Sequence, residues 1–359
     1  MKKTRINLIT TELRPRHFKI SKALNRELFD VVFHLHPNDN IVDVCGTRVM
    51  NFRSPQELIG NCKHDNKAIN HYLGVWNNDF AIHLLTNSEH PLVYETYDQL
   101  HGCCNPSHID YPSLAERQKE LLCFQEADFV TYRDFRFTCL ASELIKDRPN
   151  SALLLDGCLT GKSYGKFKKI NLSNIKFVYC GNLPEPDSKS SRNYHLEFAN
   201  RVAEHGAEYH VYPLHKKVLN QYREVHGNLE YLNNFFIHEP LPYPNLILEL
   251  TKYDVGVDLL SINGDREHDT GDFYSIECSN YASNNKLFDY IDAGLQVITH
   301  NSAFNKEILK NTDGIHFIQS FDQILNKLSS TSPRAVIPNE FKLSHTSRIL
   351  EEIYSSLLV

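Results

Sequence analysis

The sequence predicts an α/β protein built from two domains of similar design, and three observations lead to this prediction. Its 359 residues suit two domains of roughly 150 residues each. Short apolar runs typical of strands alternate with amphipathic segments typical of helices, the pattern of parallel α/β layers. The alternation starts again after a Gly- and Lys-rich stretch at 160–173, whose composition is typical of a linker.

The first half opens with a strand at 6–10, a polar loop, and a helix whose apolar side includes Phe18, Ile20 and Leu24. Further strands are expected at 31–33, 41–44, 80–85, 92–94, 129–131 and 152–155, and a further helix at 115–127. We therefore expect an N-terminal domain at 1–165.

The second half repeats the strand–helix alternation. Strands are expected at 175–180, 209–212, 235–237, 255–260 and 297–299, and helices at 192–205, 245–251 and 286–293. We expect this C-terminal domain at 166–342, followed by a final helix within 343–359 whose apolar residues share one side. Both halves are expected to be Rossmann-like, facing each other across a cleft, with ligands beyond the carboxyl ends of the strands.

Composition and charge exclude several classes of protein. The net charge of −6 argues against a protein that mainly coats nucleic acid. No run approaches the roughly 18 apolar residues that cross a membrane, and the N-terminus lacks the apolar region of a signal peptide. The nine cysteines include no Cys-x-x-Cys pair, which favours free thiols in a reducing compartment. We therefore expect a cytoplasmic protein.

Several common cofactor motifs are absent. Neither half carries Gly-x-Gly-x-x-Gly after its first strand, and there is no Gly-x-x-x-x-Gly-Lys-Ser/Thr, so nicotinamide and P-loop chemistries lose most of their support. Asp-x-Asp is also absent, so we expect no metal-bridged phosphate site and no cofactor.

The segment at 283–298 carries the strongest functional signal. Ser283 or Asn284 can cap a helix whose first residues have free N–H groups, and Lys286 adds an ammonium, which together suit a phosphate group. Asp289 follows about one turn later and can accept hydrogen bonds from ribose hydroxyls. The alternative is a helix–turn–strand unit with a surface lysine and a surface aspartate.

This segment resembles the donor-site helix of GT-B glycosyltransferases, especially the family-4-like enzymes, whose typical pattern is KxxEYxAxGxPVI. The resemblance continues in order at 91–98, 126–131, 177–183 and 253–260. It implies a GT-B fold, a nucleotide-diphospho-sugar donor bound mainly by the second domain, and a C-terminal helix that crosses back to the first domain.

The resemblance also implies site residues. Gly181 and Asn182 should approach the diphosphate, and Tyr212 should lie against the base. The implied donor-binding residues are Gly181, Asn182, Tyr212, Asn284, Asn285, Lys286, Leu287 and Asp289. The helix end and Lys286, rather than Mg²⁺, should stabilise the departing diphosphate. Lys189 and Arg192 are either additional phosphate partners or solvated loop residues.

The chain departs from the family pattern at several positions. Tyr281 stands where these enzymes usually carry a glutamate, and Gln296 stands where they carry a proline. A replacement carboxylate would come from Glu277 or from the acidic loop at 265–272, which can equally be a solvated turn. The retaining stereochemistry of the family is therefore not carried over.

The acceptor side is expected in the first domain. Arg14 and Arg16 lie in a basic cluster that could receive an anionic acceptor or contact the inner face of a membrane, the alternative being a solvated helix face. For the base that deprotonates the acceptor hydroxyl, we rank Asp98 first, then His17, then His101.

These expectations favour a metal-independent transferase that moves a sugar from a nucleotide-diphospho-sugar to a glycan or lipid-linked acceptor in surface polysaccharide synthesis. Two alternatives remain. One is a catalytically degenerate GT-B protein that binds sugar nucleotides or assists assembly, and Tyr281 keeps it open. The other is a nucleotide-sugar epimerase on the same scaffold, which no residue favours.

Overall fold

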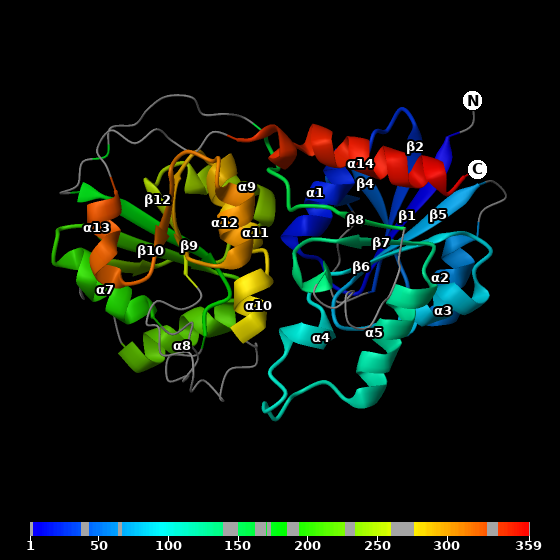
Figure 1. Ribbon diagram of the computed structural model, residues 1–359, viewed down its shortest axis with the longest axis horizontal. Helices are drawn as coiled ribbons and strands as arrows, with labels where there is room; N and C mark the ends of the chain where they lie inside the picture. Colours follow the sequence, from blue (N-terminus) through cyan, green and yellow to red (C-terminus); the bar gives the residue numbers. More distant parts are fainter. Residues whose placement is uncertain are drawn as a thin grey trace. The chain divides into compact units, whose positions relative to one another are not determined.

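The computed structural model describes residues 3–36, 43–63, 67–138, 150–161, 170, 174–184, 194–226, 234–259, 276–328 and 337–358. The chain forms two compact units (Figure 1). Unit 1 comprises Met1–Leu159 and Asn339–Val359, and unit 2 comprises Thr160–Pro338. Each unit is described here by itself.

Unit 1 is built on an eight-stranded sheet in the order β3-β4-β2-β1-β5-β6-β7-β8. Its strands are β1 (Thr4–Thr10), β2 (Phe29–Leu35), β3 (Asp43–Val44), β4 (Thr47–Asn51), β5 (Ala68–Gly74), β6 (Leu92–Thr96), β7 (Phe129–Tyr132) and β8 (Ser151–Leu153). All neighbours in this order pair in parallel except β3 and β4. The carboxyl ends of the parallel strands therefore share one edge, where the loops can gather side chains.

Helices pack on the sheet of unit 1. They are α1 (Pro15–Ala23), α2 (Pro55–Cys62), α3 (Asp79–Asn87), α4 (Leu100–Cys103), α5 (Leu114–Glu126) and α14 (Leu343–Ser356), with a short 3₁₀ turn η5 (Asn339–Phe341). The final helix α14 packs beside α1 and buries Leu350, Ile353 and Tyr354 in the same core as Ile6 of β1. The predicted return of the C-terminal helix to the first domain is thus confirmed.

One strand prediction in unit 1 was wrong, and strands β4 and β5 were not predicted. The segment at 80–85 is not a strand but part of α3, because Phe80, Ala81 and Leu84 have helical spacing and are buried on one side. The central strand β5 was missed because Asn70 and His71 interrupt its apolar run. Both side chains are fully buried, and the Nδ1 atom of His71 lies 2.7 Å from the Tyr354 hydroxyl.

Unit 2 is built on a six-stranded parallel sheet in the order β11-β10-β9-β12-β13-β14. Its strands are β9 (Lys176–Gly181), β10 (Glu208–Pro213), β11 (Phe235–Ile237), β12 (Val255–Asp258), β13 (Gln296–His300) and β14 (Ile315–Ile318). Its helices are α7 (His195–Ala203), α8 (Lys216–His226), α9 (Tyr243–Leu250), α10 (Ile276–Tyr281), α11 (Asn285–Asp292), α12 (Ala303–Leu309) and α13 (Ile324–Lys327), with the 3₁₀ turn η4 (Phe321–Gln323). The prediction of two α/β units with mainly parallel sheets is confirmed.

A tyrosine attaches α11 to the sheet of unit 2. The Tyr290 hydroxyl accepts a hydrogen bond from the Cys180 N–H at 3.0 Å and donates one to the Val257 carbonyl at 3.1 Å. Its ring lies directly against Gly256, where a Cβ atom would come within 2.3 Å of Tyr290 Cγ. Glycine at 256 therefore allows the helix to approach strands β9 and β12 closely.

No helix in the described part of the chain is long and apolar enough to span a membrane.

We expect Gly256→Ala to destabilise unit 2 by about 1–3 kcal/mol, because the added methyl group overlaps a buried ring that is hydrogen-bonded on both sides. Urea unfolding followed by circular dichroism measures this change. Gly60→Ala in helix α2 is the control, since nothing lies within 4 Å of its added Cβ. Equal stability of the two variants would contradict the close approach.

Candidate functional site

Two strand ends and one helix start meet at the candidate donor site of unit 2. Strand β9 ends at Gly181 and strand β12 at Asp258, and helix α11 begins after the cap residue Asn284. Gly181 has φ +146°, and a Cβ there would lie 3.2 Å from the Tyr179 hydroxyl. The site therefore requires glycine at 181 for backbone conformation and for space.

Lys286 points toward these strand ends rather than into solvent. Its Nζ atom lies 3.3 Å from the Tyr179 hydroxyl and 4.4 Å from the centre of that ring, a cation–π distance. Nζ also lies 3.7 Å from Asp258 Oδ1, and the side chain is 16% exposed. The alternative of a surface lysine is thus wrong for Lys286, although part of its side chain stays accessible.

Asp258 is a site residue that the sequence did not single out. Its carboxylate is fully buried, and Oδ2 accepts hydrogen bonds from Asn284 Nδ2 at 3.4 Å and from Thr299 Oγ1 at 3.3 Å. The available signal was a charged residue within the apolar run at 255–260. A buried carboxylate requires donors or a counter-ion, and here both come from neighbouring elements.

Asp289 lies one turn after Lys286 but is mostly buried. Its Oδ1 atom accepts a hydrogen bond at 2.7 Å from the hydroxyl of Tyr243, the first residue of α9. Burial and the adjacent Asp289 raise the pKa of Tyr243 well above its ordinary value, so this tyrosine remains a donor. The role of Asp289 toward a ribose stays a prediction. In this structure its carboxylate accepts a hydrogen bond from Tyr243.

The remaining residues of the predicted donor set lie in α11 and β10. Leu287 is fully buried and Asn285 nearly so, which leaves mainly backbone groups at the helix start. Tyr212, next to the end of β10, stacks on His238 with ring centres 4.4 Å apart, and its hydroxyl lies 2.7 Å from that of Tyr253. Whether Tyr212 meets a base stays a prediction.

His195, the first residue of α7, packs against the ring of Tyr179. Its ring is fully buried, packs edge-on against Tyr179 at 4.6 Å, and places Nδ1 2.7 Å from the Tyr209 hydroxyl. Burial, together with the charge of Lys286, lowers the pKa of His195 to about 3. The ring is therefore neutral and adds no charge beside Lys286.

Some predicted positions lie outside the described residues: Lys189, Arg192 and the acidic loop at 265–272. The backbone of Glu277 lies in α10, but its side chain is also outside. Among the described residues, no group of three or more His, Cys, Asp or Glu side chains could hold a metal ion.

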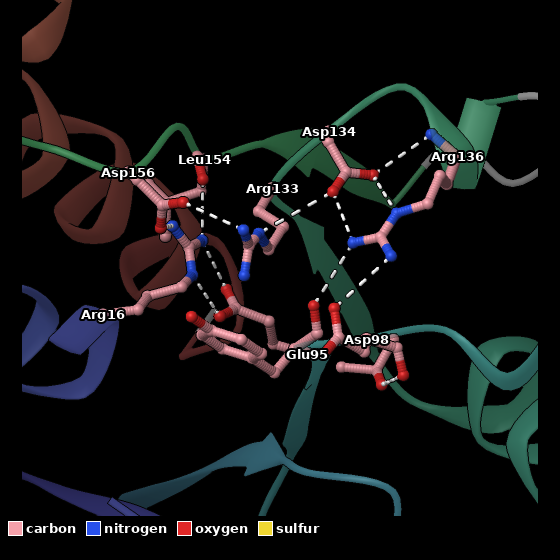
Figure 2. Close-up of polar contacts among 10 residues, drawn as sticks. Arg16, Glu95, Asp98, Arg133, Asp134, Arg136, Leu154 and Asp156 are labelled. Atoms are coloured by element: carbon pink, nitrogen blue, oxygen red, sulfur yellow. Dashed lines mark hydrogen bonds and ion pairs between the residues drawn. The ribbon is translucent and has the colours of Figure 1, made fainter. Parts of the chain in front are cut away.

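In unit 1, Arg16 is the centre of a buried ion-pair network (Figure 2). Its Nε and Nη2 atoms contact the two Glu95 oxygens at 2.5 and 2.8 Å, and Nη1 contacts Asp156 at 2.8 Å. Nη2 also donates to the Leu154 carbonyl at 2.7 Å. Arg16 is 1% exposed, so it connects α1 to β6 and to the chain after β8.

The network continues along the carboxyl ends of β7 and β8. Arg133 lies 3.5 Å from Asp156, and Arg136 forms a two-point pair with Asp134 at 2.9 and 2.5 Å. Figure 2 shows these arginines and carboxylates alternating through the cluster. Burial acts to raise the pKa of Asp156, but Arg133 and Arg16 outweigh it and lower this pKa below its ordinary value.

The three candidate bases have different surroundings. Asp98, with its side chain 21% exposed, lies 3.4 Å from Arg136 Nη1. His101 Nδ1 lies 2.8 Å from Glu120. His17 is 1% exposed, and its Nδ1 accepts the Arg14 N–H at 3.1 Å. Burial, then the charges of Arg16 and Arg14, lower the pKa of His17 to about 3.

The basic cluster of α1 is a solvated helix face only in part, since Lys22 is exposed. Arg16 and Lys19 are each 1% exposed, while Arg14 pairs with Glu12 at 2.8 Å and keeps 26% of its side chain exposed. Of the two predicted acceptor-side residues, Arg14 is therefore partly accessible and Arg16 is enclosed. The carboxylates that enclose Arg16 are 79 and 140 residues away in sequence.

The comparisons with known proteins concern the fold. No family model and no curated protein matches this chain. A glycosyltransferase structure from Rickettsia africae aligns at TM-score 0.64 and 12% identity, covering 100% of this chain and 99% of that one. A UDP-GlcNAc 2-epimerase from Neisseria meningitidis bound to UDP-GlcNAc aligns at TM-score 0.56 and 10% identity, covering 98% and 100%.

An alpha-glucosyltransferase in complex with UDP and DNA aligns at TM-score 0.52 and 10% identity, covering 99% of this chain and 91% of that one. These full-length similarities to two glycosyltransferases and an epimerase agree with the two parallel α/β units described above. The chain has the GT-B fold of two Rossmann-like domains.

We expect Arg16→Ala to destabilise the protein by about 3–5 kcal/mol, because it removes the guanidinium that pairs with buried Glu95 and one of the two that face buried Asp156. Arg14→Ala, two residues earlier, should cost less than about 1 kcal/mol, because its ion pair with Glu12 is partly exposed. Chemical denaturation of the two variants makes the comparison. Similar losses in both would mean that the network does not stabilise unit 1.

Buried histidines should make the protein less stable at acidic pH. The pKa of His17 is lowered to about 3 and that of His71 to about 4, mainly by burial, whereas both protonate near 6.5 when unfolded. Their contribution is complete above about pH 6.5 and is lost as the pH falls toward 4, by about 1.4 kcal/mol per pH unit for each histidine.

Urea unfolding of wild type and His17→Asn at pH 7 and pH 5 tests this expectation. The asparagine oxygen can still accept the Arg14 N–H that His17 Nδ1 accepts, but it does not titrate. The variant should therefore lose less stability than wild type between the two pH values. Equal losses would show that His17 is not a neutral buried base.

Proposed function

We propose that this chain is a glycosyltransferase that binds a nucleotide-diphospho-sugar on unit 2 and transfers the sugar to a hydroxyl of a glycan or lipid-linked acceptor. The observation that carries the proposal is the inward position of Lys286 at the start of α11, beside Gly181 at the end of β9. An ammonium, a helix start and a glycine at a strand end together suit a diphosphate.

The proposed chemistry places charge stabilisation on unit 2. When the bond from the sugar to the diphosphate breaks, negative charge grows on the leaving oxygen. Lys286 and the positive dipole end at the start of α11 would stabilise this charge without a metal ion. Tyr179 would keep the ammonium in place through its ring and hydroxyl.

The base for the acceptor hydroxyl is proposed in unit 1. Asp98 is the first candidate because its carboxylate is partly accessible and lies after β6, at the carboxyl edge of the sheet. His17 is a weaker candidate, since its Nδ1 already accepts a backbone N–H and its ring is buried. Arg14 is the acceptor-side residue that this proposal retains. A cytoplasmic location is part of the proposal, as is surface polysaccharide as the destination of the sugar.

A UDP-sugar 2-epimerase is the second candidate function. It is favoured by the full-length similarity to the Neisseria meningitidis enzyme, at a TM-score of 0.56. An epimerase would return a changed sugar still attached to its nucleotide, whereas a transferase without acceptor would slowly release the free nucleoside diphosphate. A binding protein without turnover, the reading that Tyr281 keeps open, would do neither.

We expect Lys286→Ala to weaken the binding of UDP and of the UDP-sugar together, by roughly 1.5–3 kcal/mol, because each loses a charge-assisted contact with the diphosphate. Isothermal titration calorimetry measures both affinities. Lys310→Ala is the matched control, because this exposed lysine of unit 2 pairs with Glu307 and lies outside the site. GDP, ADP and CDP are titrated in parallel to identify the nucleotide.

The same wild-type preparation is incubated with UDP-sugars in EDTA, and the products are separated by chromatography. Release of UDP supports the transferase, and an epimerised UDP-sugar supports the second candidate. Unchanged nucleotide affinity in Lys286→Ala would remove the donor-site assignment. Complete loss of sugar release in EDTA, restored by Mg²⁺, would contradict the metal-independent mechanism.

A further inference from the structure

A buried carboxylate faces the lysine of the proposed phosphate site. Asp258 ends strand β12 with its side chain 0% exposed, and its Oδ1 atom lies 3.7 Å from Lys286 Nζ. Oδ1 accepts no hydrogen bond from the residues that the structure describes. An aspartate so close to a phosphate-binding cation is unexpected, because it repels the anion that the lysine would bind.

Hydrogen bonds to the second oxygen of Asp258, Oδ2, determine the orientation of this carboxylate. Oδ2 accepts hydrogen bonds from Asn284 Nδ2 and Thr299 Oγ1, and Thr299 is itself held by Asn305 Nδ2 at 2.8 Å. Asn305 is fully buried in the start of α12. The network thus turns Oδ1 toward Lys286, so the lysine presents an ion pair rather than an isolated charge.

We propose that Asp258 is a counter-ion of Lys286 that lowers the affinity of the site for nucleoside diphosphates and so speeds the release of the product nucleotide. This inference rests on the proposed function. The two charges lie 3.7 Å apart at a buried strand end, where water screens their interaction less than in bulk solvent. A diphosphate that binds Lys286 must compete with the carboxylate for the ammonium and also lies within its repulsive field.

A purely structural role for Asp258 makes the opposite prediction. If the carboxylate serves only to hold Lys286 in position, its removal would release the ammonium and weaken nucleotide binding, as Lys286→Ala does. If it competes with the nucleotide, its removal strengthens binding. The sign of the change in affinity therefore separates the two roles.

Asp258→Asn is the decisive variant because it removes the charge and almost preserves the shape. Its amide oxygen can accept from Asn284 and Thr299, and its NH₂ group then faces the bound anion. We expect UDP to bind on the order of tenfold more tightly than to wild type. UDP should also become a correspondingly stronger inhibitor of UDP-sugar hydrolysis.

Asp254→Asn is the matched control. Asp254 precedes the same strand at its opposite end, where Oδ2 accepts the Lys176 N–H at 3.0 Å. The substitution Asp254→Asn removes one negative charge from unit 2, as Asp258→Asn does, but the affinity for UDP should stay unchanged. If Asp258→Asn fails to fold, Asp258→Ser removes the carboxylate with a smaller side chain, and the same tightening is expected.

The outcomes distinguish this inference from the function on which it rests. Wild type that binds none of the four nucleoside diphosphates would overturn both. Wild type that binds UDP, together with a folded Asp258→Asn that binds it equally or more weakly, would overturn the counter-ion role alone. Equal tightening in Asp254→Asn would also overturn it, because the effect would then be one of net charge.

Discussion

Arg16 is the residue on which the carboxyl edge of unit 1 depends. A guanidinium that is 1% exposed can remain in the protein interior only if carboxylates and carbonyls satisfy its donors, and Glu95, Asp156 and Leu154 do so. These partners come from β6 and from the chain after β8, while Arg16 comes from the first helix. One side chain therefore fixes three segments at the edge where the loops meet.

The two units differ in how accessible their buried cations are. Arg16 contacts its carboxylates at 2.5–2.8 Å and is enclosed, so an incoming anion would have to break strong buried pairs. Lys286 lies 3.3 Å from a hydroxyl and 3.7 Å from a carboxylate, and it stays 16% exposed. The partly accessible cation is the one that a ligand can reach. This difference is the reason why we propose the anion site in unit 2 rather than on the arginines of unit 1.

Packing around α11 fixes the helix that carries Lys286 against the sheet. Gly256 lets the Tyr290 ring approach β12, and the Tyr290 hydroxyl joins β9 to β12 through two backbone groups. The start of the helix is thereby fixed against the strand ends that carry Gly181 and Asp258. A site that must place an ammonium to within a fraction of an ångström benefits from a helix held in this way.

The sequence by itself determined the features that depend on neighbours in the chain. Apolar periodicity predicted most strands and the second α/β unit, and the spacing within 283–298 predicted the helix that carries Lys286. The predicted cap was wrong in part, because Asn284 stands at the N-cap position but its side chain makes no cap hydrogen bond. Only the tertiary structure decided which charges are enclosed. Arg16 is buried because Glu95 and Asp156 arrive from 79 and 140 residues away, and Asp258 faces Lys286 across 28 positions because β12 and α11 adjoin. Such pairings depend on how strands are ordered in a sheet, and a local pattern of residues does not contain that order.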